Sequence, residues 1–67
     1  MRKIRFTSLH GVPMHGDIRQ ELRIGRCVVA VVYALGKVYA VTNGFSLVEA
    51  DANVTMSELM EMIMEEI

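Results

Sequence analysis

The sequence predicts an α+β fold, in which a small antiparallel β-sheet of three to five strands carries one C-terminal α-helix packed across it. Three features support this prediction. Apolar residues have the spacing of strands between residues 3 and 50, an Asn-Gly pair marks a tight hairpin, and residues 56–67 repeat with the period of a helix. A chain of 67 residues forms a single small domain, residues 1–67, which buries only about 60% of the surface that its unfolded chain exposes.

Residues 3–9 alternate between apolar and polar side chains, with Ile4 and Phe6 on one side. This pattern predicts a half-buried strand with a basic outer face. Residues 10–17, HGVPMHGD, contain two glycines and the only proline of the chain, and therefore predict a loop.

Residues 17–24 fit two kinds of structure. As a strand, they place Ile18, Leu22 and Ile24 on one face and alternate in charge. As a helix, they have a capping box formed by Asp17 and Gln20 and a glycine suited to the C-terminal cap. We favour the strand because the alternation of charge is regular.

The middle of the chain predicts a sheet. Residues 26–34 are rich in β-branched residues without interruption, as in a central strand that is covered on both faces. Residues 35–37 predict a turn into a strand at 38–42. Asn43 and Gly44 then predict a type I′ turn, because both of its central positions need positive φ, and residues 45–50 form the answering strand.

The closing helix is predicted to begin near Met56. Thr55 is a suitable N-cap, Glu58 completes a capping box, and Val54 can meet Leu59 as a hydrophobic staple. At about 100° per residue, the helix has an apolar stripe, an acidic ridge on the opposite side and two methionines on the shoulders of the stripe. The stripe contains Met56, Leu59, Met60, Ile63 and Ile67, the ridge Glu58, Glu61 and Glu65, and the shoulders Met62 and Met64.

Charge is divided unevenly along the chain, although the net charge is only −1. Residues 1–37 hold all seven Lys and Arg and two of the eight acidic residues, for a net charge of +5. Residues 38–67 hold the other six acidic residues and no Lys or Arg, for −6. The halves could neutralise each other within one fold, or each could attract a charged partner.

The sequence favours no catalytic or metal-binding role. His10 and His15, with Asp17 and Cys27 as further ligand types, could bind a metal, but His-x4-His spacing alone is a weak signal, because a structural zinc site has four defined ligands and usually short paired spacings. We favour two loop histidines in contact with water. Cys27 opens the most apolar strand, and no acidic residue is placed to orient a base. The glycines lack the spacing of a phosphate-binding loop. We therefore expect no catalytic residue, no metal and no cofactor.

These features together predict a non-catalytic protein-binding module, such as a modulator, inhibitor or adaptor that docks on a larger assembly. Small accessory proteins of phages or mobile elements often have this size and composition. The expected contact surfaces are the methionine shoulders, the acidic ridge and the basic strands. The corresponding residues are Met62, Met64, Glu58, Glu61, Glu65, Arg5 and Arg23.

Two alternatives and a location complete the expectations. The basic residues could meet phosphates, but the net charge of −1 and the few aromatic residues make nucleic acid the weaker choice of partner. A structural homodimer is also possible, because so small a domain gains buried area by self-association.

No apolar run has the roughly 18 residues of a membrane span, and the polar start of the chain does not resemble an export signal, so we expect a soluble, cytoplasmic protein.

Overall fold

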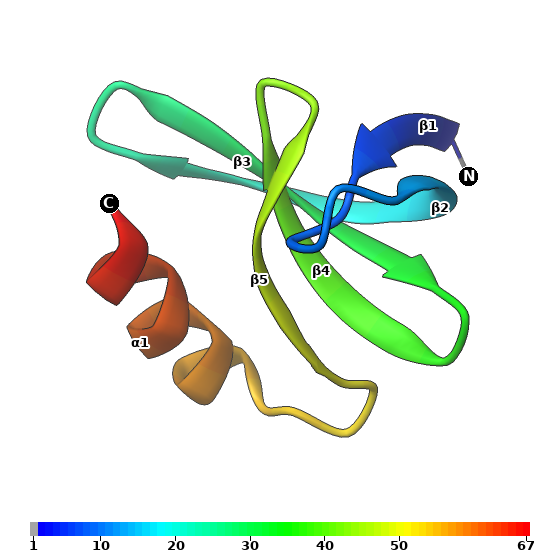
Figure 1. The fold of residues 1–67 in the computed structure, drawn as a ribbon. Helices are drawn as coiled ribbons and strands as arrows, with labels where there is room; N and C mark the ends of the chain where they lie inside the picture. The colour runs from blue at the N-terminus through cyan, green and yellow to red at the C-terminus, as the bar shows by residue number, and fades with distance from the viewer. Residues whose placement is uncertain (1) are drawn as a thin grey trace.

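The computed structural model describes residues 2–67 and confirms the α+β fold, with five strands and one C-terminal helix (Figure 1). The predicted loop at residues 10–17 is wrong in its second half, because the second strand already begins at Pro13. The elements are β1 (Arg2–Thr7), β2 (Pro13–Ile24), β3 (Cys27–Ala34), β4 (Lys37–Thr42), β5 (Phe45–Asp51) and α1 (Met56–Glu66).

The strands form an antiparallel meander that closes into a barrel in the order of the sequence. Closure depends on a single parallel pair, Thr7 with Phe45, next to a hydrogen bond of 2.8 Å from the amide of Thr7 to the carbonyl oxygen of Gly44. The rest of β1 pairs only with β2. One edge of β1 is thus joined to β5 at its C-terminal end alone.

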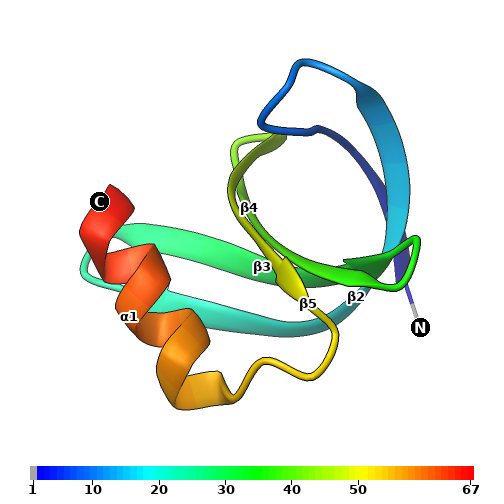
Figure 2. The ribbon, with the colours of Figure 1, turned by 60° about the horizontal axis from the view of Figure 1, so that its bottom comes forward.

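Strand β3 is covered on both faces from Val29 onward, as residues 26–34 predict, whereas Val28 near its start is exposed. Val29 and Val31 belong to a helix-side core that also contains Leu59 and Ile63 of α1, whereas Val32 lies in a second, barrel core. Figure 2 shows α1 on one side of the sheet, with β1 and the start of β2 curling over the other. The barrel core contains Phe6, Val32, Ala34, Tyr39 and Val41.

Residues 17–24 are a strand, but their apolar side chains do not share one face. A bulge lies between Ile18, which pairs with Val32, and Gln20, which pairs with Val31. The extra residue reverses the alternation of side chains along β2. Ile18 therefore packs against the barrel core and Leu22 against the helix-side core. This bulge explains why the apolar spacing is irregular enough to resemble a helix.

The early start of β2 depends on two residues that rarely occupy strands. Pro13 is the first residue of the strand, where its missing amide costs no ladder hydrogen bond. Gly16 faces the interior, and a Cβ atom there would lie against the side chain of Val32 and 2.9 Å from the carbonyl oxygen of Tyr33. The absence of a side chain allows β2 to cross close to β3, and the segment pairs with β1 instead of forming a loop.

The predicted turn at Asn43 and Gly44 is confirmed, because their φ angles are 53° and 82°. Leu35 and Gly36 form a second two-residue turn with φ angles of 52° and 73°. Such a turn normally has Asn, Asp or Gly in both positions. Leu35 is therefore an unusual residue for its conformation.

The start of α1 is confirmed in detail. Thr55 is the N-cap, its hydroxyl oxygen accepts a hydrogen bond of 3.1 Å from the amide of Glu58, and the carboxylate of Glu58 accepts one of 3.2 Å from the amide of Thr55. Val54 and Leu59 both pack at the helix-side core, as the predicted staple requires. No helix within residues 2–67 has the length and apolar content needed to cross a bilayer.

The predicted apolar stripe of α1 is only partly correct. Leu59 and Ile63 are buried, and Met62 packs against the helix-side core, but Met56 and Ile67 are exposed. The buried face is centred on Leu59 and Ile63. Met62 thus lies closer to the core than the predicted orientation of the helix implies.

Candidate functional site

The loop between β1 and β2 is held in one shape by Ser8. The buried hydroxyl oxygen of Ser8 accepts hydrogen bonds from the amides of His10, at 3.3 Å, and Val12, at 3.1 Å. The backbone of Ser8 adds a donated bond of 2.9 Å to the carbonyl of Val12 and an accepted bond of 3.0 Å from the amide of Gly11. Local hydrogen bonds of this kind are how Ser orders turns. They hold the apolar side chains of Leu9 and Val12 at the surface.

Among residues 2–67, Leu35 is the most exposed large apolar residue, with 86% of its surface accessible. It occupies the first central position of the β3–β4 turn at positive φ, a conformation that an L residue with a bulky side chain adopts at a cost. The leucine side chain at this position stabilises neither the turn, where it occupies positive φ, nor the core, from which it is exposed.

Leu35 and Val12 line a recess of about 510 Å³ at one end of the barrel. A second recess of about 400 Å³ adjoins it and shares the three residues Pro13, Met14 and His15. We call the two together the barrel-end groove. Its first part is lined by Ser8, His10, Val12, Pro13, Met14, His15, Leu35 and Glu49, and its second adds Arg5, Phe6, Thr7 and Gly44.

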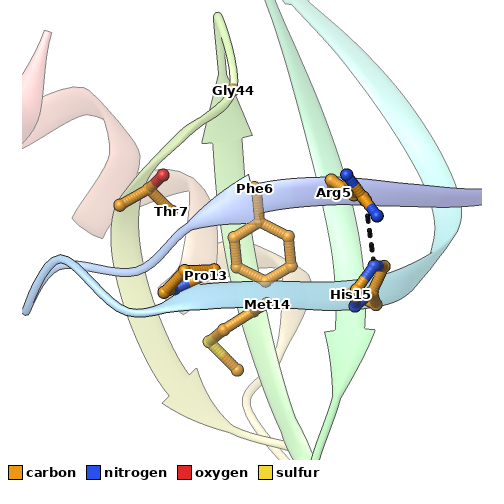
Figure 3. A pocket seen from close by; sticks show the side chains of 7 residues that line it. All are labelled: Arg5, Phe6, Thr7, Pro13, Met14, His15 and Gly44. Atoms are coloured by element: carbon orange, nitrogen blue, oxygen red, sulfur yellow. Dashed lines mark hydrogen bonds between the residues drawn. The ribbon is translucent and has the colours of Figure 1, made fainter.

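Polar groups border the apolar part of the groove. Figure 3 shows Arg5 and His15 side by side across β1 and β2, where the Nε of Arg5 donates a hydrogen bond of 3.1 Å to Nε2 of His15. On the other border, Glu49 of β5 lies opposite Tyr39 of β4. Burial, followed by hydrogen bonding to Glu49 and by its negative charge, raises the pKa of Tyr39. The groove thus joins a basic border to an acidic one across an apolar floor.

The structure separates the predicted contact residues instead of gathering them. Arg5 lines the groove, but Arg23 lies near the other end of β2, beside Val28. Met62 and Glu65 line a small recess with Leu9. The remaining three lie on the outer surface of α1: Glu58, Glu61 and Met64.

Three of these residues have distinct environments on α1. The two hydrogen bonds that Glu58 makes with Thr55, first to its side chain and then to its backbone, lower the pKa of Glu58. Glu58 therefore has a structural role at the start of the helix. Met62 is half-buried, whereas Met64 is 56% exposed, so the two methionines do not form one continuous surface.

The uneven charge of the sequence is only slightly neutralised within the fold. Among residues 2–67, one ion pair joins the basic half to the acidic half, Lys37 with Asp51 at 3.6 Å. The pair of Arg2 and Glu21, at 3.7 Å, lies within the basic half. The guanidinium of Arg19 stacks over the ring of Tyr33, 4.6 Å from its centroid. Most of the charged side chains are thus available to partners outside the domain.

Residues 2–67 contain no group of three or more His, Cys, Asp and Glu side chains placed to hold a metal ion. His15 uses Nε2 to accept the bond from Arg5, and His10 is exposed on the loop. Cys27 is half-buried against the helix-side core.

Sequence reasoning missed the barrel-end groove, because its lining comes from segments that are distant in the sequence: β1, β2 and the loop between them, the β3–β4 and β4–β5 turns, and β5. One signal was present in the sequence. In Leu35-Gly36 a leucine occupies the turn position that usually belongs to Asn or Gly.

Comparison with known proteins gives no relative: no protein-family model, no curated protein and no solved structure matches this chain.

Proposed function

We propose that this chain is a small non-catalytic protein-binding module, a modulator, inhibitor or adaptor that docks on a larger protein assembly. The observation that carries the proposal is Leu35, a leucine that is 86% exposed and held at a φ of 52°. An exposed leucine loses the free energy that burial would supply, and positive φ adds a conformational cost. A partner that covers the side chain would supply the free energy of burial and so offset the conformational cost.

The surroundings of Leu35 support a protein partner. Val12 is 52% exposed beside the same recess, so the two side chains offer joint apolar contact. Contiguous apolar surface with a polar rim commonly marks an interaction site. The groove is also built from turns on a rigid barrel, which is a common arrangement in binding proteins. We place this interaction in the cytoplasm, the location expected from the sequence.

The variant Leu35→Asn tests the proposal. Asparagine tolerates positive φ better than leucine does, so the variant keeps or gains stability while it loses the apolar contact. Tagged wild type, Leu35→Asn and the control Val28→Thr are used to capture partners from the native host after nuclease treatment. Val28 is exposed on β3 near Arg23, away from the groove.

We expect the same protein to be captured by wild type and Val28→Thr and to be lost with Leu35→Asn. Thermal midpoints of the three proteins show that loss of binding is not loss of folding. If wild type captures no protein, the proposed function is contradicted; if capture is unchanged in Leu35→Asn, the contact at Leu35 is contradicted.

Two competing functions give different results in the same material. For a basic-face nucleic-acid-binding regulator, wild type shifts DNA or RNA in gels at about 0.15 M salt, and the double variant Arg5→Glu/Arg23→Glu loses the shift. For a structural homodimer, sedimentation gives twice the monomer mass without any host partner. Accessory proteins of phages or mobile elements, in contrast, would retain a host protein after nuclease treatment.

A further inference from the structure

We propose that the free edge of β1 binds an extended acidic segment of the partner protein as an additional antiparallel strand. The inference rests on the proposed protein-binding function. It adds a second contact surface, the edge of β1, and specifies that the segment bound there is acidic. It concerns the edge from Lys3 to Arg5, next to the part of the barrel-end groove that Arg5 and Phe6 line.

The direction of the backbone groups of β1 follows from its hydrogen bonds. The amide of Thr7 donates to Gly44, on the side away from β2, whereas the amide of Ser8 donates to Val12, immediately before β2. Backbone groups alternate in direction along a strand. The N–H and C=O groups of Lys3 and Arg5 therefore point the same way as those of Thr7, to the edge away from β2.

This edge is unpaired along most of its length. Thr7 is the only residue of β1 that pairs with β5, and the register with β2 is unbroken from Arg2 to Thr7. Strand edges are usually protected by proline, by a bulge, by a covering element or by charge. Of these, β1 has charge alone, in the exposed side chains of Lys3 and Arg5. The unpaired backbone groups of β1 can therefore form hydrogen bonds with an added strand, provided that its side chains are compatible with the positive charges of Lys3 and Arg5.

The side chains of β1 specify the sequence of such a strand. Residues directly opposite Lys3 and Arg5 would have their side chains on the same face as these cations, within pairing distance. The residue between them would lie beside Ile4, which is half-buried against the barrel core. The edge therefore fits an acidic residue, an apolar residue and a second acidic residue in succession.

A second copy of the chain does not fit the same edge through its own β1. Two antiparallel β1 strands would place Lys3 and Arg5 of one copy opposite the cations of the other, and like charges directly opposite destabilise a strand pair. The charge that prevents this self-association is the charge that selects an acidic strand.

A backbone-methylated peptide set tests the pairing. The probe is a short fluorescent peptide with Glu-Val-Glu flanked by threonines, and its binding is followed by fluorescence anisotropy. In an antiparallel addition, the amides of both glutamates point to β1 and the amide of valine points away. We expect N-methylation of the glutamates to abolish binding and N-methylation of valine, at the same charge, to preserve it. Equal binding by all three peptides would overturn the proposal, and the reverse pattern would overturn the antiparallel register.

Charge reversal tests the side-chain contacts. Lys3→Glu/Arg5→Glu should bind the probe at least about tenfold more weakly and should bind a Lys-Val-Lys peptide instead. Arg26→Glu/Lys37→Glu has the same change in net charge outside β1 and should bind the probe as wild type does. Loss of binding in both double variants would show attraction by overall charge and would overturn the edge site.

The peptide measurements are independent of the host partner that tests Leu35. If no peptide binds but Leu35→Asn still loses the captured protein, the edge inference fails and the proposed function stands. If wild type captures no host protein, the proposed function fails whatever the peptides show.

Discussion

The backbone of Gly16 lies directly against the side chain of Val32, where β2 crosses β3 inside the barrel. A methyl group at Gly16 would meet Val32, the carbonyl oxygen of Tyr33 at 2.9 Å and the Cβ of Ala34 at 3.1 Å. The carbonyl belongs to a paired strand and cannot move without disturbing the sheet. This contact makes the start of β2 possible and is open to a direct test.

Gly16→Ala should lower the free energy of unfolding by about 2 kcal/mol, because the added methyl overpacks the barrel core. Denaturant unfolding measures the change. Gly25→Asn is a matched control, since Gly25 has a φ of 61° and open space around it, and asparagine tolerates that conformation. A Gly16→Ala protein with wild-type stability would contradict the close packing of β2 on β3.

Tyr39 should make stability fall at alkaline pH. Its pKa is raised in the folded state, chiefly by burial and then by Glu49, so the unfolded chain releases the phenolic proton first. The contribution is complete below the unfolded pKa of about 10 and is lost as the pH rises through the folded pKa. Unfolding midpoints of wild type and Tyr39→Phe between neutral pH and pH of about 11 should converge as pH rises. A difference between the two midpoints that stays constant with pH would contradict this prediction. Tyr33→Phe is the control variant.

Glu58 should have the opposite effect at acid pH. Its folded pKa is lowered by hydrogen bonds with Thr55, so its contribution is present above the unfolded pKa of about 4.3 and is lost as the pH falls through the folded value. The stability difference between wild type and Glu58→Gln should therefore shrink below that pH. Glu61→Gln, on the exposed side of the same helix, should show a smaller change with pH. Equal changes in the two variants would remove the special role of the capping box.

The two methionines of α1 should respond differently to the same substitution. Met62→Gln should lower the free energy of unfolding by about 1 kcal/mol or more, because it places an amide against the helix-side core. Met64→Gln should change it by less than about 0.5 kcal/mol, because that side chain is exposed. If the helix forms a contact between copies, sedimentation should show loss of self-association in Met64→Gln. Equal destabilisation by both variants would mean that the helix is rotated from its present orientation.

The sequence by itself determined the elements that depend on neighbouring residues. Asn43 and Gly44 specify their turn because both accept positive φ, and Thr55 with Glu58 specifies the start of α1 by reciprocal hydrogen bonds. The β-branched residues of β3 predict a strand covered on both faces, which the two cores confirm. In each case a local rule and the final fold require the same structure.

Only the tertiary structure decided the features that join distant residues. The bulge after Ile18 sends Ile18 and Leu22 to different cores, which a fixed period of two cannot anticipate. The orientation of α1 depends on which side chains the sheet can cover, so Met62 is drawn to the core and Met64 is left outside. The barrel-end groove needs Val12 and Leu35 to meet, and the free edge of β1 exists because closure stops at Thr7 and Phe45. These relationships follow from packing between segments far apart in the chain, and the spacing of residues within one segment does not specify that packing.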